Sequence, residues 1–324
     1  MAGPRPQRFA MPIVIAHRGA SGYLPEHSLA AKALAHASGA AFLEQDVVAT
    51  RDDQCVVLHD IHVDRVTDVA IRFPGRARDD GRFYARDFDL EELKQLRLTE
   101  RTDAAGKPVF PERFPAGPTG LTIPTLSEEL ALISGLNRST GREVGVYPEI
   151  KRPAWHHEEG VDLAALVLDA LAKHGYRDHP EEVFLQCFDL KENIRIREQF
   201  NPRYPMVQLI ADDTWGESTT RYSELLTEPG LVGLKGVVNA IGPWVEQLYT
   251  VENEAILETS LVEWAHALDL RVHPYTLRRD ALPRGFTDFQ ALHAWLMKQG
   301  IDGVFSDFAD LSVSLFTQLG AENL

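Results

Sequence analysis

The sequence predicts an α/β fold, a TIM (β/α)8 barrel with an insertion between its second and third strands. Eight short apolar runs suited to strands begin at positions 13, 42, 143, 182, 206, 236, 271 and 303. Amphipathic segments suited to helices follow most of these runs, which is the alternation of an α/β protein. The runs are apolar without interruption, as in parallel strands covered on both faces. Eight such units are the number that closes a TIM barrel.

Composition is typical of a soluble globular protein. With 324 residues, of which 44% are hydrophobic and 25% charged, the chain is long enough for one large domain or two medium ones. The eight predicted units favour a single domain spanning 1–324. The net charge of −15 argues against nucleic acid or an anionic membrane as a partner. No run approaches the roughly 20 apolar residues of a membrane span, so we expect no stable membrane insertion. The oligomeric state is left open.

The start of the chain and its cysteines bear on location. The first predicted strand, Ile13 to Ala16, begins too early for a signal peptide to precede it. We therefore expect a cytoplasmic protein, or a periplasmic one if an export signal has been removed. Cys55 and Cys187 lie in apolar strand-like runs, which favours two buried free thiols over a disulfide.

A polar loop connects the first predicted strand to the first predicted helix. The strand stops at His17 and Arg18, and a helix is predicted for 26–38 with Gly39 as its stop signal. The order of strand, polar loop and helix is that of a βα unit whose loop carries function.

Residues 42–60 are the most informative stretch. They predict two short strands joined by a polar turn. Because strand side chains alternate, Glu44 and Asp46 project from the same face, and two carboxylates that close repel unless a positive charge lies between them. A divalent cation fits that place. His59 follows the second strand, and an imidazole beside a metal suggests phosphoryl or acyl chemistry.

Residues 61–122 interrupt the alternation of strands and helices. The stretch is rich in Arg, Asp, Gly and Pro, with one clear amphipathic segment at 90–98. It is too long for a simple loop, so we expect an insertion that caps the barrel mouth. Beyond it the alternation resumes, with helices predicted for 126–136, 163–174, 252–268, 288–298 and 309–319, and another beginning at Asp189.

Polar residues gather where the predicted strands end. In a TIM barrel the active site is built at the carboxyl ends of the strands. A structural role explains any single pair, as a surface ion pair would explain Glu149 with Lys151, but agreement at five strand ends predicts an active site. The five pairs are His17 with Arg18, Glu44 with Asp46, Glu149 with Lys151, Gln186 with Phe188, and His273 with Tyr275.

Six short segments form a recognisable series along the chain. In order they are HRG (17–19), PEHS (25–28), the run 42–60, PEIK (148–151), QCF (186–188) and DGVFSDFAD (302–310). This series resembles the successive signatures of the glycerophosphodiester phosphodiesterase family, and it spans nearly the whole chain. The resemblance implies a TIM barrel that hydrolyses a small-molecule glycerophosphodiester to sn-glycerol 3-phosphate and an alcohol.

The resemblance also implies a role for each matching residue. The roles are Ca²⁺ or Mg²⁺ ligands for Glu44, Asp46 and Glu149, the acid/base pair for His17 and His59, phosphate contacts for Arg18 and Lys151, and a position close to the metal for Glu26. Gln186, Phe188 and Tyr275 are expected to line the substrate site. The chain departs from the family pattern at Cys187, Ala309 and Tyr275, where Ser, Pro and Trp are usual, and these changes bear on packing.

Two other interpretations stay open. A phospholipase D-like or cyclising lipid phosphodiesterase on the same barrel would use the same histidines and carboxylates, and it requires an apolar rim. A non-catalytic phosphodiester-binding module would be expected to lack a catalytic position, and no such position is missing here.

Overall fold

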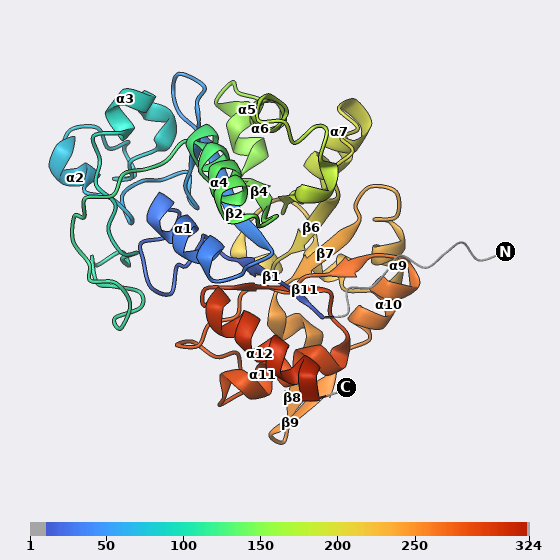
Figure 1. Ribbon diagram of the computed structural model, residues 1–324. Helices are drawn as coiled ribbons and strands as arrows, with labels where there is room; N and C mark the ends of the chain where they lie inside the picture. The colour runs from blue at the N-terminus through green and yellow to red at the C-terminus, as the bar shows by residue number, and fades with distance from the viewer. Residues whose placement is uncertain (1–10, 323–324) are drawn as a thin grey trace.

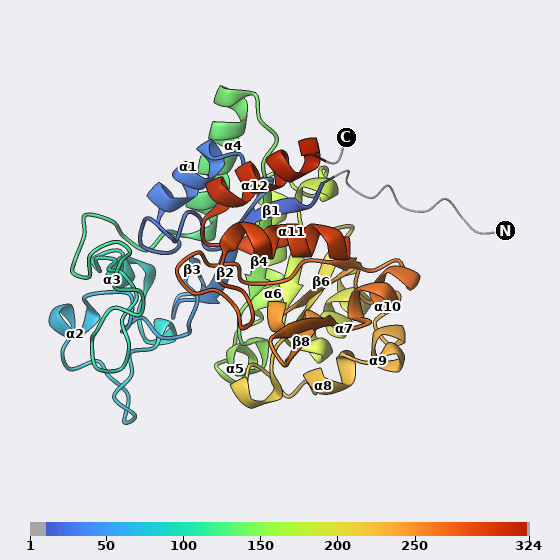
Figure 2. The same cartoon turned by 90° about the horizontal axis from the view of Figure 1, so that it is seen from below.

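Eight parallel strands form the centre of the molecule. The computed structural model describes residues 11–322. The strands, in their order around the sheet, are β10 (Arg271–Val272), β7 (Ala240–Pro243), β6 (Met206–Ile210), β5 (Leu185–Cys187), β4 (Gly145–Ile150), β2 (Phe42–Ala49), β1 (Ile13–Ala16) and β11 (Gly303–Ser306). Each neighbouring pair is parallel. Figures 1 and 2 show the strands at the centre and the helices around them. The predicted barrel is confirmed.

The barrel closes between β10 and β11 through single backbone hydrogen bonds. Asp302 N–H donates to Val272 O and Phe305 N–H donates to Pro274 O, both at 3.0 Å. The sequence predicted a longer seventh strand, 271–276, but β10 is only two residues long. Pro274 offers no N–H to a ladder, which accounts for the short strand.

Alternation along the strands separates two layers of core. On β2, Phe42 lies in a cluster inside the barrel with Tyr147, Phe184 and Phe305. Leu43 belongs to the larger cluster between the barrel and the helices. Because Glu44 and Asp46 share the parity of Phe42, they point inward, at the carboxyl end of the barrel.

Several of the outer helices begin at side-chain caps. Thr125 caps α4 in a reciprocal capping box with Glu128, while Asp189 and Asp288 cap α7 and α11. The helices of the barrel layer are α1 (Leu29–Ala37), α4 (Leu126–Thr140), α5 (Pro153–Glu158), α6 (Leu163–Lys173), α7 (Leu190–Gln199), α8 (Tyr222–Leu225), α9 (Glu228–Val232), α10 (Leu261–Ala267), α11 (Phe289–Gln299) and α12 (Ala309–Glu322). Short 3-10 turns are η2 (Pro180–Glu182), η3 (Asp213–Trp215) and η4 (Val245–Leu248).

The first helix begins later than predicted. Ser28 is the N-cap of α1, and its hydroxyl accepts a hydrogen bond from Ala31 N–H at 3.1 Å. Glu26 and His27, which the sequence assigned to the helix, therefore lie in the loop between β1 and α1. His27 has a positive φ of 60°, which no helix residue adopts.

The prediction of one helix over 252–268 is wrong in its first half. Residues 249–258 form an antiparallel hairpin, β8 (Tyr249–Glu252) with β9 (Ala255–Glu258), and only α10 follows as a helix. Asn253 and Glu254 turn the hairpin with φ values of 48° and 66°. A two-residue turn of this kind favours Asn at its first position, but Glu at the second gives no signal.

The insertion, residues 61–122, has a core of its own. It contains α2 (Val69–Arg72), the turn η1 (Ala85–Asp87) and α3 (Leu90–Leu93), and its apolar cluster includes Phe83, Phe88 and Leu96. Within the amphipathic segment 90–98 the helix ends at Leu93, and Leu98 makes extended contacts with Thr67 and Leu121 instead. β3 (Cys55–Val57) pairs antiparallel with β2 and leads into this part. Figures 1 and 2 show it beside the barrel, in cyan to teal.

The cysteines and the lengths of the helices can be checked within residues 11–322. Cys55 is half-buried and Cys187 buried, and both are free thiols. Across this described part of the chain, none of the helices combines the length and the apolar character that crossing a bilayer requires.

Candidate active site

A cavity of about 250 Å³ opens at the carboxyl end of the barrel. We call it the first cavity. It brings together residues from strands far apart in the sequence, as the strand-end pattern predicted. The residues that line it include His17, Arg18, Glu44, Asp46, His59, Glu149, Gln186, Phe188 and Tyr275, together with Trp215, Trp244 and Arg278.

The three predicted metal ligands lie side by side on two paired strands. Asp46 on β2 is the register partner of Glu149 on β4, and Glu44 stands two residues before Asp46 on the same face. Their exposed fractions are 2% for Glu44, 0% for Asp46 and 4% for Glu149. Three buried carboxylates therefore face one cavity.

The electrostatics of this group fit a divalent cation. Burial and the neighbouring Asp46 raise the pKa of Glu44 to about 8. Burial also raises the pKa of Glu149 well above its ordinary value, although Lys151 opposes that shift. Asp46 Oδ1 has no hydrogen-bond partner among the described residues. Carboxylate oxygens left short of positive charge are the ligands that Ca²⁺ and Mg²⁺ prefer.

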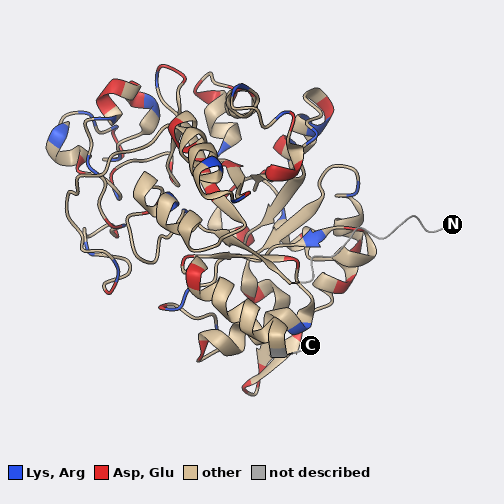
Figure 3. Ribbon diagram, in the orientation of Figure 1, with Lys and Arg blue, Asp and Glu red and all other residues tan. Residues whose placement is uncertain are grey.

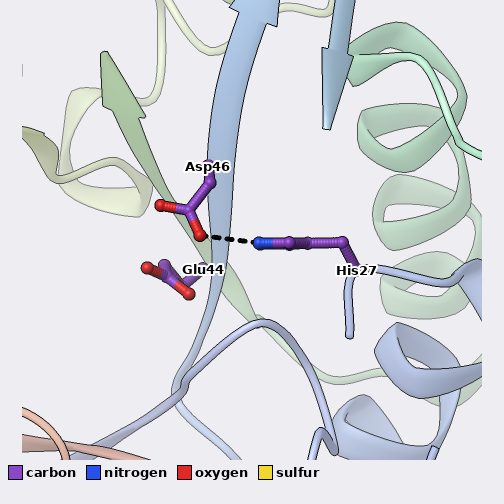
Figure 4. A group of neighbouring side chains, drawn as sticks. All are labelled: His27, Glu44 and Asp46. Carbon is purple, nitrogen blue, oxygen red and sulfur yellow. Dashed lines mark hydrogen bonds and ion pairs between the residues drawn. The ribbon is translucent and has the colours of Figure 1, made fainter. Parts of the chain in front are cut away.

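His27 joins the carboxylates, and the sequence interpretation missed it. Its Nε2 lies 2.7 Å from Asp46 Oδ2, and suitable ligand atoms of His27, Glu44 and Asp46 lie within 4.8 Å of one another (Figure 4). Burial lowers the pKa of His27 to about 3, so the imidazole is neutral. Its position in the PEHS segment, next to Glu26, was the available signal, but it was assigned to a helix.

Both predicted acid/base histidines are oriented by a carboxylate. His17 Nδ1 lies 2.6 Å from Asp307 Oδ1, and His59 Nδ1 lies 2.7 Å from Asp60 Oδ1. Such a bond fixes the ring and its tautomer, so that Nε2 is the nitrogen free to exchange a proton. Burial and Arg18 lower the pKa of His17 to about 4, and the same two causes lower the pKa of His59.

The loop after β1 holds its polar residues in a constrained backbone. Arg18 has a φ of 57°, and its N–H donates to Glu44 Oε2 at 2.6 Å. Gly19 has a φ of 84°, and a Cβ there would come within 2.9 Å of the Ala31 backbone. Only glycine therefore lets this loop lie against α1 while Arg18 reaches the carboxylates.

The two predicted phosphate contacts are both engaged with carboxylates. Arg18 Nη1 donates to Glu26 Oε2 at 3.0 Å, and Lys151 Nζ lies 2.9 Å from Glu149 Oε1 and 3.7 Å from Asp46 Oδ1. Although burial opposes it, the attraction of Glu149 and Asp46 raises the pKa of Lys151, so its ammonium stays charged. Lys151 lines a neighbouring pocket together with His59, which also lines the first cavity.

The predicted substrate-lining residues Gln186, Phe188 and Tyr275 also line the first cavity. Gln186 Nε2 lies 3.4 Å from Glu44 Oε1, and its Oε1 has no partner among the described residues. Phe188 and Tyr275 pack edge to face, with ring centroids 5.8 Å apart. His273 is instead buried inside the barrel, with Nδ1 2.8 Å from Tyr147 Oη.

Asp307, Arg101 and Arg113 are residues at the site that the sequence interpretation did not predict. Asp307 follows β11 within the DGVFSDFAD segment, and it accepts hydrogen bonds from Arg278 Nε at 2.9 Å and Arg113 Nη2 at 2.8 Å. Glu26 is held by Arg101 at 2.8 and 2.6 Å as well as by Arg18. The strand-end rule pointed to Asp307, but nothing local in the sequence places Arg101 or Arg113 at the barrel.

Comparison with solved structures supports the fold. A protein of Silicibacter pomeroyi aligns with a TM-score of 0.70 at 22% identity, covering 96% of this chain and 94% of that one. An Oleispira antarctica phosphodiesterase, solved in complex with the product sn-glycerol-3-phosphate, aligns with a TM-score of 0.64 at 23% identity, covering 95% and 97%.

Comparison of sequences also identifies the family. A glycerophosphodiester phosphodiesterase of Haemophilus influenzae is 41% identical over 322 residues, covering 93% of this chain and 88% of that protein. One from Treponema pallidum is 37% identical over 324 residues, covering 93% and 90%. The model of the glycerophosphoryl diester phosphodiesterase family matches residues 17–311, which include every predicted site residue. By its sequence from the first strand to the last helix, this chain belongs to that family.

Proposed function

We propose that this enzyme hydrolyses glycerophosphodiesters to sn-glycerol 3-phosphate and an alcohol, with a divalent cation and two histidines as general acid and base. One observation carries the proposal: two carboxylate-oriented imidazoles, His17 and His59, line the same cavity as three buried carboxylates. The activity of the curated relatives and the product bound to the Oleispira antarctica protein support it.

Glu44, Asp46 and Glu149 would hold the cation, Ca²⁺ or Mg²⁺. When bound, such a cation polarises a phosphoryl oxygen and lowers the pKa of a coordinated hydroxyl. His27 Nε2–H donates to Asp46 Oδ2 and so fixes the direction of that carboxylate. Burial and neighbouring carboxylates raise the pKa values of Glu44 and Glu149, so a cation between these side chains would favour their charged forms.

The histidines divide the proton transfers. One removes a proton from the attacking oxygen, and the other protonates the leaving alkoxide. We assign the acid to His59, because its side chain is 27% exposed against 10% for His17 and can be reprotonated from water. Asp307 and Asp60 stabilise the imidazolium that each ring becomes in turn.

Charged and aromatic groups position the substrate. Arg18 and Lys151 offset the negative charge that develops on phosphorus, with Arg278 as a further guanidinium on the cavity wall. Gln186, Phe188 and Tyr275 line the side of the first cavity where the glycerol moiety would lie next to the metal carboxylates.

Product analysis tests the proposal. Glycerophosphocholine incubated with the protein and Ca²⁺ or Mg²⁺ should yield choline and sn-glycerol 3-phosphate, and exhaustive chelation should stop the reaction. Phosphocholine and glycerol as products, or unchanged turnover after chelation, would contradict it.

We also propose that the insertion, 61–122, caps the barrel mouth and limits the size of the leaving alcohol. Its residues Arg101, Val109 and Phe110 line a hollow together with His17 and His59 of the barrel. Replacing 61–122 by a short linker should change the preference between glycerophosphodiesters and lysophospholipids more than it changes the thermal midpoint. A collapsed midpoint with unchanged preference would assign the insertion a structural role.

A lipid phosphodiesterase is a second candidate, and one observation favours it. Trp215 and Trp244 line the first cavity with ring centroids 5.2 Å apart, and Trp215 is 44% exposed. This aromatic rim would suit an acyl chain. Release of choline from lysophosphatidylcholine faster than from glycerophosphocholine would favour the lipid activity.

A further inference from the structure

A second cavity, of about 230 Å³, adjoins the first on the side of the insertion. The two cavities share His17, Arg18, His59 and Arg278. A phosphodiester has two ester arms that leave phosphorus in different directions. Because both proposed acid/base groups stand at the junction, a substrate with phosphorus there would extend one arm into each cavity.

The charges around the second cavity are paired except for one. Arg101 bonds Glu26 through Nε and Nη2, and it bonds Asp60 through Nη1. Arg113 bonds both oxygens of Asp280. Arg113 and Arg278 both bond Asp307, and Arg18 bonds Glu26. The four guanidiniums of the lining thus face four carboxylates, Glu26, Asp60, Asp280 and Asp307, and Glu100 is a fifth.

Glu100 is the unmatched group. It lines the second cavity, its exposed fraction is 4%, and its Oε2 has no hydrogen-bond partner among the described residues. Burial and the charge of Glu26 raise its pKa to about 7. Arg113 and a hydrogen bond from the Arg101 backbone oppose that rise, but they leave Oε2 without a donor. A buried carboxylate oxygen without a partner is costly unless a ligand supplies the missing positive charge. Val109 and Phe110 add apolar surface to the same cavity.

We propose that the second cavity receives the leaving alcohol, and that Glu100 selects alcohols that carry an ammonium group, such as choline and ethanolamine. The carboxylate pairs with the ammonium, and Val109 and Phe110 contact its carbon substituents. This inference rests on the proposed phosphodiesterase function and adds a preference among its substrates.

Kinetics on a charged and a neutral alcohol test the preference. Glycerophosphocholine and glycerophosphoglycerol are compared for the wild type, for Glu100→Gln, and for Glu112→Gln, which removes an exposed charge elsewhere in the insertion. Glu100→Gln should lower kcat/KM for glycerophosphocholine about tenfold, mainly through KM, because one ion pair is lost from binding. It should leave kcat/KM for glycerophosphoglycerol within about twofold, and Glu112→Gln should leave both unchanged.

Binding of choline separates failure of this inference from failure of the proposed function. Calorimetric titration of choline into the wild type and Glu100→Gln requires no turnover. Weaker binding to Glu100→Gln supports the ammonium site even if the wild type hydrolyses no glycerophosphodiester, in which case only the proposed function fails. Equal loss of kcat/KM on both substrates, or unchanged choline binding in Glu100→Gln, would overturn the ammonium site.

Discussion

Asp89 in the insertion, where Figure 3 shows many acidic and basic residues, and Glu44 at the barrel mouth are carboxylates in opposite surroundings. In the insertion, both oxygens of Asp89 accept hydrogen bonds from Arg51, at 2.8 and 2.6 Å, and these bonds hold the pKa of Asp89 below its ordinary value. At the mouth, Glu44 is buried and accepts from the Arg18 backbone and from Gln186, and its pKa rises to about 8.

The difference in pKa between Asp89 and Glu44 distinguishes a carboxylate with a structural role from one with a functional role. An exposed carboxylate whose two oxygens both accept from a guanidinium has its hydrogen-bonding capacity met within the protein. Its ion pair contributes little to the free energy of unfolding. A buried carboxylate with no neighbouring positive charge lowers the stability of the fold. Such carboxylates are typical of functional sites, where a ligand can supply that charge. Glu100 belongs with the second kind, although it lies in the insertion.

The largest effect on turnover is expected at the two histidines that line the first cavity with Glu44, Asp46 and Glu149. Replacing His17 or His59 by Ala should lower turnover on the order of 100-fold or more, because a general acid or base is lost. Metal affinity, measured by calorimetry, should barely change. A p-nitrophenyl phosphodiester, whose leaving group needs no proton, should rescue the variant that lacks the acid, which we expect to be His59→Ala. Lost metal binding in either variant would make that histidine a ligand.

A smaller effect should separate the two kinds of carboxylate directly. Glu149→Gln keeps the size of a mouth carboxylate and removes its charge, so activity at limiting metal should fall at least about tenfold and the metal requirement should rise. The matched control is Glu92→Gln in the insertion, where Arg76 Nη1 bonds Glu92 at 2.8 Å on the surface. It should change stability by less than about 1 kcal/mol and leave the metal titration unchanged. Similar metal titrations for Glu149→Gln and Glu92→Gln would contradict the distinction between a metal-binding carboxylate and a structural one.

The smallest effect concerns the stability cost of Glu100. Its pKa is about 7 in the folded protein against an ordinary value of 4.5, so between these values the folded state holds a proton that the unfolded chain has released. The free energy of unfolding should therefore fall as pH rises from 4.5 to 7, by about 2 kcal/mol from this group. Denaturant titrations at pH 5 and pH 8 should show a smaller loss for Glu100→Gln than for the wild type. Equal losses would mean that Glu100 has a partner in solution.

Much of the site could be predicted because each strand contributes a local signal. Glu44 and Asp46 on one strand, and Glu149 on another, needed only alternation and the rule that barrel strands end at one face. Asp307 followed the same rule and was overlooked as a site residue.

Other contacts have no local signal. Arg101 and Arg113 reach the barrel only because the insertion folds back onto it, and their spacing in sequence says nothing about that path. His27 was missed for a different reason: the helix was started two residues too early, and the positive φ of His27 is invisible in a helical pattern. The β8–β9 hairpin was read as a helix because Glu254 takes a left-handed conformation that its residue type does not favour.

The pairing of His17 with Asp307 has a consequence for the order of folding. The two residues lie 290 positions apart in the chain, and Arg113 is 194 positions from Asp307. During synthesis the first strand and the insertion leave the ribosome long before the segment that orients His17. β1 must wait for β11, its parallel neighbour, before the barrel can close. We therefore expect no activity until almost the whole chain has been made. A fragment that stops short of residue 307 would carry Glu44, Asp46 and Glu149 without an oriented His17.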